Sequence, residues 1–520
     1  MLTIPDQLNI ATHFIDSNVA LGRGQKIAIE CSEQRVTYTQ LLERTNRVGN
    51  ALHQLGVRPE ERVCLVLQDV PEFLYSFFGA IKIGAVPVPI NPRLRPPEYE
   101  YILNDTRARV LIASQELVGN VQQANGSQQR LTRIVVGAQQ DGYLGLYDLL
   151  EQSSPELAAY PTCKDDAAFW LYSSGSTGPP KGCVHLQHDM LFPTQYYAKD
   201  ILHISETDRC YSVAKLFFAY GLGNAGYFPL SAGATTILSA ARATPEGVYS
   251  DIERYRPTLF YSVPSNYAAL LAHTRRGPEF DLSCIRHAIS AGEPLPPALF
   301  QRFKDRFGIQ ILDALGSTEM LHMVISNRPG ELKAGSSGKI IPGYEARIVD
   351  DSEHEVAPGE IGSLLIKCDA TCAGYWNQHE KTKEMFLGHW LSTGDKYYQD
   401  EDGFFWYAGR ADDLFKVNGR WLSPTEVEAA LISHSSVLEA AVVPRQDGDG
   451  LLKPAAYVVL NTEHKMAPEF VLELQRWVAE RLSWHKSPRW IEFLDELPKT
   501  ATGKLQRFKL RERQHRSAMG

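Results

Sequence analysis

The first part of the chain alternates between two hydrophobic periods. Between residues 41 and 55 apolar side chains recur at helical spacing, and Gly56 follows as a stop signal. The stretch GAVPVPINP at 84–92 carries three prolines, so we expect an extended segment there rather than a helix. Short apolar runs, typical of buried strands, lie at 63–67, 110–113, 134–136 and 167–171. This alternation of helices and buried strands predicts an α/β fold.

The pattern changes in the second half of the chain. Short strand-like segments separated by Gly, Pro and Asp turns predict a smaller β-rich subdomain, at 346–349, 362–366 and 404–407. Past Arg410 a compact α+β pattern begins, with strands expected at 440–443 and 455–460 and an amphipathic helix through 470–482. We therefore expect a large domain over 1–410 and a small mobile domain over 411–520.

The start of a helix in the small domain can be placed closely. Ser423 suits the N-cap, Pro424 suits the first helical turn, and Glu426 stands three residues after the cap. The pattern predicts a capped helix that begins at Pro424.

Composition limits the classes of partner. The 520 residues carry a net charge of −8 with no basic run, which argues against nucleic acid or an anionic membrane as the main partner. Eight scattered cysteines without a CxxC pair indicate reduced thiols rather than disulfides or a zinc site. The N-terminal stretch lacks the pattern of a signal peptide, and no uninterrupted apolar run reaches about 18 residues. We expect a soluble, cytoplasmic protein.

A loop rich in glycine and hydroxyl side chains carries the first chemical signal. The segment Tyr172-Ser-Ser-Gly-Ser-Thr-Gly-Pro-Pro-Lys-Gly182 follows an apolar run. Its glycines let the backbone wrap an anion, its hydroxyls can donate, and Lys181 adds positive charge, which suits the phosphates of a nucleotide. It is not a Walker loop, because Pro180 stands where that motif needs Gly and Gly182 where it needs Ser or Thr.

This segment resembles the phosphate loop of the adenylate-forming superfamily, which includes acyl- and aryl-CoA synthetases, carrier-loading adenylation domains and firefly luciferase. Further motifs stand in the family's order, and the resemblance covers essentially the whole chain: Ser290-Ala-Gly-Glu-Pro294, Gly316-Ser-Thr-Glu319, Ser392-Thr-Gly-Asp395, Gly409-Arg-Ala-Asp-Asp413 and Pro498-Lys-Thr-Ala-Thr-Gly-Lys504. The benzoate-CoA ligase branch is the most similar, in the segments 215–224, 316–330 and 487–492.

The resemblance implies a reaction in two halves. A carboxylate attacks the α-phosphate of ATP to give acyl-AMP and pyrophosphate, and the thiol of coenzyme A then displaces AMP. The first half requires two anions to be neutralised and held in line. The resemblance assigns this work to Mg²⁺ bound by Glu319, to Thr177 and Thr318 near phosphate oxygens, and to the loop residues Ser174, Gly175, Ser176, Gly178 and Lys181.

The resemblance also assigns the nucleoside. Asp395 matches the family's ribose-binding aspartate, and Arg410 is expected near the same sugar. The adenine region is implied at Gly292, Glu293, Pro294, Asp313 and Leu315. Leu315 departs from the aromatic residue of many relatives, so we expect aliphatic contact with the purine instead of stacking.

Two further assignments concern the small domain. Lys504 matches the lysine that reaches the adenylation site, where a mobile ammonium can bridge a carboxylate and an α-phosphate oxygen. Lys499, Arg507 and Lys509 are interpreted as ordinary surface residues of a basic tail. Asp412 occupies the family's hinge position, and rotation there would withdraw Lys504 and bring the Gly419 loop to the site for thioester formation.

The pocket for the acid is predicted from aromatic and small residues side by side. In Phe217-Phe-Ala-Tyr-Gly221 small residues leave room and aromatic walls favour a flat ring. The resemblance implies a lining of Phe218, Ala219, Tyr220, Gly316 and His322. His322 could equally be a buried core histidine. Benzoate is the first expectation, with hydroxy-, amino- and fluorobenzoates left open.

Two other functions fit parts of the pattern. An aryl-acid adenylating enzyme that loads a carrier protein would share every ATP motif, although no fused carrier segment is present. A non-catalytic regulator that binds the acid or the nucleotide would be marked by loss of Lys504 or Glu319, and both are present. The sequence shows no interface for the homodimer that the resemblance allows.

Overall fold

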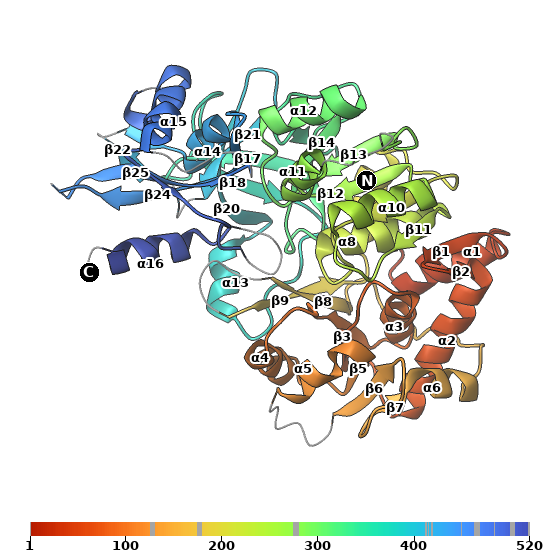
Figure 1. Ribbon diagram of the computed structural model, residues 1–520. Helices are drawn as coiled ribbons and strands as arrows, with labels where there is room; N and C mark the ends of the chain where they lie inside the picture. The colour runs from red at the N-terminus through yellow and green to blue at the C-terminus, as the bar shows by residue number, and fades with distance from the viewer. Residues whose placement is uncertain are drawn as a thin grey trace.

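The computed structural model of the protein describes residues 2–124, 131–173, 179–273, 280–410, 413, 415–417, 420–448, 450–461, 468–482, 484–499 and 505–517. Figure 1 shows the N-terminal elements at one end, the C-terminal elements at the other, and the long central sheet between them. The architecture is mixed α/β with several sheets, which confirms the predicted class.

The N-terminal sheet is parallel and has the strand order β4-β3-β5-β6-β7. Its strands are β3 (Arg62–Val66), β4 (Val86–Pro89), β5 (Val110–Ser114), β6 (Thr132–Val136) and β7 (Leu144–Gly145). The apolar runs predicted as strands are confirmed. The proline-rich segment is extended, as predicted, and it forms β4 at the sheet edge, where prolines lacking an N–H are tolerated.

Both faces of this sheet are covered, which explains its continuous apolar strands. In β3, Val63 and Leu65 join the main core, whereas Cys64 and Val66 join a second cluster on the opposite face. The helices around the sheet are α2 (Tyr38–Gln54), α3 (Pro71–Lys82), α4 (Pro96–Thr106), α5 (Val118–Gln122) and α6 (Leu146–Gln152). The predicted helix over 41–55 is confirmed as α2, and a Thr37–Gln40 capping box starts it.

The central sheet has nine strands in the order β16-β15-β14-β13-β12-β10-β11-β1-β2. The strands are β1 (Ile27–Cys31), β2 (Gln34–Thr37), β10 (Arg209–Ser212), β11 (Thr235–Leu238), β12 (Leu259–Ser262), β13 (His287–Ser290), β14 (Ile311–Gly316), β15 (Met323–Ser326) and β16 (Lys339–Ile340). Helices α10 (Pro245–Tyr255), α11 (Pro264–Ala272) and α12 (Pro297–Phe307) bury their apolar side chains in one cluster with Phe260, Ala288 and Ile311 of the sheet. The other face belongs to the main core shared with α2 and α3.

Two smaller β structures join these layers. A ribbon is formed by β8 (Ala167–Ser173) and β9 (Lys181–Leu186), which pair antiparallel. The predicted β-rich subdomain is confirmed as an antiparallel sheet of β17 (Glu345–Val349), β18 (Gly362–Lys367), β19 (Phe386–Leu387), β20 (Trp390–Gln399) and β21 (Phe405–Arg410), with α13 (His379–Met385) beside it.

The C-terminal elements form a separate small core. A three-stranded sheet of order β24-β25-β26 is accompanied by a β22–β23 ribbon and by helices. The elements are β22 (Phe415–Val417), β23 (Arg420–Leu422), α14 (Pro424–Ile432), β24 (Val437–Gln446), β25 (Leu452–Leu460), α15 (Pro468–Arg481), β26 (Trp490–Phe493) and α16 (Arg507–Ser517). The predicted strands and the predicted amphipathic helix are confirmed.

The start of α14 differs from the prediction in its capping. The helix begins at Pro424 with Ser423 as N-cap, as predicted, but the Ser423 side chain makes no capping hydrogen bond. Its hydroxyl lies 2.8 Å from the Thr425 hydroxyl instead, and Glu426 accepts hydrogen bonds from Lys486. The predicted side-chain capping is therefore wrong, because the neighbouring Thr425 hydroxyl and the distant Lys486 bind the two side chains that would form it.

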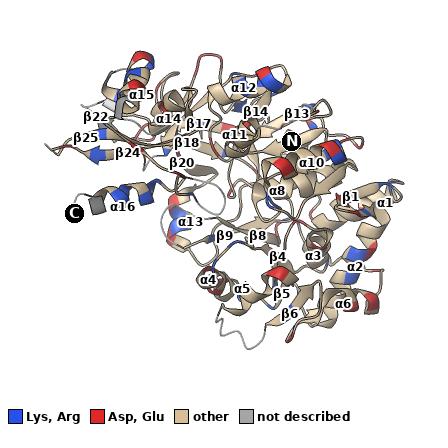
Figure 2. Ribbon diagram, viewed as in Figure 1, with Lys and Arg blue, Asp and Glu red and all other residues tan. Residues whose placement is uncertain are grey.

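Arg507 also differs from the prediction, because it is not an exposed residue of a basic tail. Its guanidinium donates to both carboxylate oxygens of Glu428, at 2.9 and 2.7 Å, and pairs with Asp413 at 3.4 Å. The Arg507 side chain is only 15% exposed and that of Glu428 only 10%. Figure 2 shows Lys and Arg residues along α16, which lies beside β24. Arg507 and Arg511 thus attach α16 to the carboxylates of Glu428 and Asp413.

The structure also bears on the cysteines and on membrane crossing. The eight cysteines are all free thiols. Within the part of the chain that the structure describes, no helix has both the length and the apolar character needed to cross a bilayer.

We expect the Arg507→Met variant to destabilise the small domain, because the buried Glu428 carboxylate loses its positively charged partner. The cost should be about 3 kcal/mol in the free energy of opening of α16 and β24. Native-state hydrogen exchange of the amides in these elements measures it. Lys367→Met is the control, because Lys367 and Glu345 form an exposed pair that should contribute less than about 1 kcal/mol. Equal effects of the two replacements would contradict the assignment.

Candidate active site

The β8–β9 ribbon presents the two ends of the predicted phosphate loop. In its register Tyr172 lies opposite Gly182 and Ser173 lies opposite Lys181. The loop residues Ser174, Gly175, Ser176, Thr177 and Gly178 fall outside the described residues, so their placement stays a prediction. The ribbon nevertheless fixes where the loop leaves and re-enters the fold, with the Lys181 side chain on its returning strand.

Glu319 is held at this end of the ribbon by residues from three segments. Its carboxylate Oε1 accepts a hydrogen bond from the Ser173 hydroxyl at 3.2 Å and another from the Tyr375 hydroxyl at 2.9 Å. Its backbone carbonyl accepts from the Cys372 amide at 2.8 Å. The Lys181 ammonium lies 4.6 Å from the centroid of the Tyr375 ring. The structure thus brings together Glu319 and Lys181, which are 138 positions apart in the sequence.

The environment keeps Glu319 anionic. Burial by itself raises the pKa of this carboxyl group. Hydrogen bonds from its own backbone amide, from Tyr375 and from Ser317, together with the positive charge of Lys181, outweigh burial and leave the pKa below its ordinary value. An ionised carboxylate at the mouth of a phosphate loop is a suitable ligand for a hard divalent cation. No cluster of three or more His, Cys, Asp or Glu side chains suited to a metal occurs among the described residues.

The turn that carries Thr318 and Glu319 is tightly constrained. The Thr318 carbonyl lies 2.8 Å from Nε2 of buried His185, whose Nδ1 lies 2.9 Å from the Asp189 carboxylate. A side chain at Gly316 would collide with the His322 backbone carbonyl. Leu321 adopts a left-handed conformation with φ of 66°, which is uncommon for a branched side chain. Backbone strain of this kind is often found at functional sites.

The residues predicted around adenine lie at the ends of β13 and β14. Gly292, with φ of 90°, makes the turn after β13 that leads to Glu293 and Pro294. Asp313 and Leu315 lie on β14, and the Asp313 carboxylate accepts from the Leu295 amide at 3.3 Å. Burial raises the pKa of Asp313 to about 8, although hydrogen bonds from Leu295, Ala314 and Ser290 act in the opposite direction. Its carboxyl group is therefore protonated near neutral pH.

Asp395 and Arg410 are direct neighbours across the β20–β21 pairing. Arg410 Nη1 lies 3.1 Å from Asp395 Oδ1 and donates to the Thr393 carbonyl at 3.2 Å. The Asp395 side chain is largely buried and that of Arg410 is partly exposed. The two residues predicted at the ribose thus form one ion pair in the structure, and their contact with a sugar stays a prediction.

The segment predicted to line the acid pocket forms a short helix, α8 (Ala219–Leu222), that continues into a π-helical turn at Gly223–Tyr227. Phe218 is its N-cap residue and lies against Phe217 with ring centroids 4.1 Å apart. The Tyr220 hydroxyl lies 3.2 Å from the Ser262 carbonyl and 3.3 Å from the Ile289 carbonyl. Local π-helical turns are often found at functional sites.

His322 is buried, and it lies beside the predicted pocket segment. Its Nε2 is 3.1 Å from the Asn224 side-chain oxygen, and its ring lies 5.8 Å from that of Tyr220 and 4.4 Å from that of Phe228. Burial lowers its pKa to about 3, so the ring is neutral at physiological pH. A side chain at Gly223 would strike this ring. Burial of His322 is therefore confirmed, and its contact with an acid stays a prediction.

Three predicted residues of the small domain fall outside the described part of the chain, namely Asp412, Gly419 and Lys504. The sequence reasoning also missed residues that the structure brings to Glu319. Tyr375 and Ser173 bind its carboxylate, and His185 holds the preceding carbonyl. Only Ser173 stood in a recognised motif. Tyr375 lies far along the chain and carries no spacing signal, so only the folded backbone reveals it.

Comparison with known proteins identifies the class of this fold and site. The family model described as AMP-binding enzyme matches residues 17–376, and the model described as AMP-binding enzyme C-terminal domain matches residues 426–504. The chain belongs to the AMP-binding enzyme family.

Individual relatives narrow the class further. The chain is 46% identical over 514 residues to benzoate–CoA ligase of Thauera aromatica, covering 98% of this chain and 97% of the relative. It is 44% identical to 4-hydroxybenzoate–CoA/benzoate–CoA ligase of Rhodopseudomonas palustris (strain ATCC BAA-98 / CGA009), covering 97% and 94%. The crystal structure of anthranilate CoA ligase AuaEII with anthranoyl-AMP matches with a TM-score of 0.96 and 42% identity over 99% of both chains. The protein is an AMP-forming acid–CoA ligase.

We expect Tyr375→Phe to slow adenylation by about 10-fold or more, because a hydrogen bond to a charged group contributes about 1.5–3 kcal/mol. Removing the hydroxyl takes away one of the interactions that lower the Glu319 pKa, so that pKa should rise. The acid limb of the pH profile should then move to higher pH. Pyrophosphate exchange into ATP between about pH 3 and 8 measures both effects, because the acid limb lies below the ordinary glutamate pKa of about 4.3. An unchanged acid limb would contradict the role of Tyr375.

Proposed function

We propose that this enzyme ligates benzoate or a substituted benzoate to coenzyme A, through an acyl-AMP intermediate, with release of AMP and pyrophosphate. One observation carries the aromatic substrate: likeness over nearly the whole chain to ligases named for benzoate, hydroxybenzoate and anthranilate. The acid–CoA ligase reaction supplies the chemistry, and the aromatic surroundings of Tyr220 and His322 support a flat ring as the acid.

The adenylation half-reaction requires an acyl carboxylate to approach a polyanion. In our proposal Ser174, Gly175, Ser176, Thr177 and Gly178 wrap the phosphates with backbone and hydroxyl donors, as glycine-rich loops do. Lys181 lies on the strand that follows this loop, and Thr318 lies next to Glu319 in the turn after β14. Fixed donors aimed at the phosphates stabilise the charge that moves from the carboxylate to pyrophosphate.

A magnesium ion fits the donor set at Glu319. Mg²⁺ in nucleotide enzymes is commonly held by one or two carboxylates together with substrate phosphates, rather than by a cage of protein ligands. The single anionic carboxylate of Glu319 suits this mode. Glu319 would hold the ion, which would neutralise phosphate charge when bound. Ser173 and Tyr375 orient the carboxylate for that task.

The nucleoside is proposed to lie between β14 and the β20–β21 pair. Asp395 can accept from both ribose hydroxyls, and Arg410 fixes its orientation through their ion pair. Gly292, Glu293 and Pro294 with Asp313 and Leu315 are the proposed surroundings of adenine. A protonated Asp313 can donate as well as accept, which a carboxylate cannot.

The small domain is proposed to serve both half-reactions in turn. We place the boundary between a domain of residues 1–410 and one of residues 411–520, with Asp412 as hinge. Lys504 would bridge the acid and the α-phosphate during adenylation and withdraw afterwards, while the Gly419 loop approaches for thioester formation. Arg507, three residues after Lys504, forms ion pairs with Glu428 and Asp413. These ion pairs hold the start of α16 against the rest of the small domain, which supports movement of Lys504 together with that domain.

The acid pocket is proposed between α8 and the turn after β14. Phe218, Ala219 and Tyr220 come from one side, and Gly316 and His322 from the other. No charged side chain belongs to this proposed lining, which favours an uncharged ring. The alternative of an adenylating enzyme that loads a carrier protein has beside it one relative named for AMP ligation alone, p-hydroxybenzoic acid–AMP ligase FadD22 of Mycobacterium tuberculosis (strain CDC 1551 / Oshkosh), at 30% identity. The greater likeness to CoA ligases favours free coenzyme A as the acceptor.

The substrate class is tested by AMP formation that depends on both ATP and coenzyme A. A panel should contain benzoate, aminobenzoates, hydroxybenzoates, cinnamate and short fatty acids. We expect benzoates to exceed fatty acids in kcat/KM by at least about 100-fold, because lost ring contacts cost several kcal/mol. Equal or better turnover of a fatty acid would refute the aromatic assignment. AMP release only in the presence of a carrier protein would favour the carrier-loading function.

The role of Lys504 is tested by separating the two half-reactions. Lys504→Ala should abolish acid-dependent pyrophosphate release, while supplied acyl-AMP should still react with coenzyme A at a rate similar to the wild type. The reason is that its charge is needed only while the acid and the α-phosphate approach each other. Lys499→Ala is the matched control, since Lys499 is paired with Glu439 at 2.6 Å and should affect neither half-reaction. Parallel loss of both half-reactions in Lys504→Ala would count against this division.

A further inference from the structure

Two acidic residues, Glu319 and Asp105, accept hydrogen bonds from opposite faces of the β8–β9 ribbon. Successive residues of a strand point to opposite faces. Ser173 binds the Glu319 carboxylate, and the preceding Tyr172 donates to the Asp105 carboxylate at 2.6 Å. The ribbon therefore connects the central sheet, which carries Glu319, with helix α4, which carries Asp105.

The segment that pairs with β9 repeats this alternation. Tyr375 donates to Glu319, whereas the next residue, Trp376, donates from its indole nitrogen to the Asp105 backbone carbonyl at 2.9 Å. The Trp376 amide also donates to the Gly182 carbonyl at 2.8 Å. The pair Tyr172–Ser173 and the pair Tyr375–Trp376 thus each link Glu319 to Asp105.

Aromatic packing and a glycine keep Tyr172 in place. The rings of Trp170 and Trp376 have centroids 4.6 Å apart, and the Arg62 guanidinium lies 5.5 and 5.7 Å from these rings. A side chain at Gly182 would lie 3.3 Å from the Tyr172 ring, so a bare backbone lets the ring cross the ribbon. The hydroxyl of Tyr172 therefore has little freedom to choose another partner.

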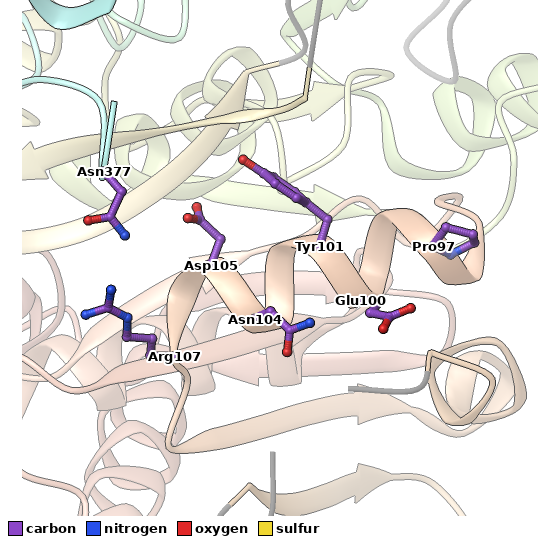
Figure 3. A pocket seen from close by; sticks show the side chains of 7 residues that line it. All are labelled: Pro97, Glu100, Tyr101, Asn104, Asp105, Arg107 and Asn377. Atoms are coloured by element: carbon purple, nitrogen blue, oxygen red, sulfur yellow. The ribbon is translucent and has the colours of Figure 1, made fainter. Parts of the chain in front are cut away.

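Asp105 also borders open space. It lies near the end of α4 and helps to line a hollow of about 530 Å³ with Tyr101, Asn104, Arg107 and Asn377. Figure 3 shows the Asp105 carboxylate pointing from α4 toward the strands above it, on the side where Tyr101 and Asn377 lie. Half-buried Tyr172 keeps its proton, since desolvation and the neighbouring carboxylate both raise the pKa of its hydroxyl. The Tyr172 hydroxyl is therefore the donor and Asp105 the acceptor.

We propose that Asp105 is a positioning residue for ATP, which acts through Tyr172 to hold the phosphate loop in register with Glu319. The proposal rests on the proposed function of that loop. Tyr172 is two positions before the loop residue Ser174, and its partner across the ribbon is Gly182, next to Lys181. A fixed Tyr172 ring thus fixes the strand ends from which the loop starts and returns. Small displacements of groups that position a substrate have large effects on rate.

The experiment compares Tyr172→Phe, Asp105→Ala and Asp105→Asn in the full-length enzyme. The first two remove the hydrogen bond, and we expect each to raise the KM for ATP in pyrophosphate exchange at least about tenfold. Their double variant should be no worse than the single variants, because both break one interaction. Asp105→Asn should recover most of the loss, since its amide oxygen still accepts from Tyr172.

The second half-reaction separates positioning from general damage. Supplied benzoyl-AMP needs no triphosphate binding, so its reaction with coenzyme A should stay within about twofold of the wild type in each variant. Tyr211→Phe is the matched control, because buried Tyr211 makes the same kind of bond, at 2.8 Å, to Asp251 on α10. It should leave the KM for ATP unchanged. Thermal melting of every variant shows whether the fold is intact.

Three outcomes would overturn the proposal. The first is an unchanged KM for ATP in Tyr172→Phe. The second is an equal fall of both half-reactions, and the third is an equal effect of Tyr211→Phe; either would make the hydrogen bond merely structural. Calorimetric titration with ATP and Mg²⁺ tests the loop without any acid. A failure of every aromatic acid as substrate would therefore refute the proposed function while leaving the ATP measurement of Asp105 intact.

Discussion

The Glu319 carboxylate is the point at which the separate sheets of this enzyme meet. It is presented by a turn after β14 of the central sheet, it accepts from Ser173 on the ribbon, and it accepts from Tyr375 in the segment before α13. An anion in a partly buried position is costly unless donors surround it. The hydrogen bonds and the nearby Lys181 charge meet that requirement, and they lower the pKa of the group instead of raising it. Three distant segments must therefore fold correctly for one carboxylate to stay ionised.

The layers around this point explain why it can be held so closely. The parallel N-terminal sheet and the central sheet share a main core, and each has a further cluster on its other face. Strands buried on both sides have little freedom to slip, because a shift of one residue would exchange the two apolar sets. The β8–β9 ribbon lies between these sheets, where Tyr172 attaches it to helix α4 and Ser173 attaches it to the turn after β14. The proposed nucleotide site is thus built on rigid elements, while the part proposed to move lies in the small domain.

The errors of the sequence reasoning share a cause. Ser423 and Glu426 fit a capping box locally, yet Thr425 and Lys486 take their side chains in the fold. Arg507 fits an exposed basic tail, yet it pairs with buried Glu428. In each case a partner distant in sequence, or a neighbouring hydroxyl, competes with the local pattern. For Glu426 and Arg507 this competition depends on which elements pack together, and one-dimensional spacing carries no information about it.

The sequence by itself determined the α/β class, the strands predicted at 63–67, 110–113 and 134–136, the helix predicted over 41–55, and the ordered motifs that place the chain among adenylate-forming enzymes. These follow from hydrophobic period and from contiguous residues, which are local properties. Only the tertiary structure decided that Tyr375 binds Glu319, that Asp105 binds Tyr172, and that His322 is buried beside Tyr220. These contacts join residues 56, 67 and 102 positions apart, so the packing of whole layers, and no local pattern, determines them.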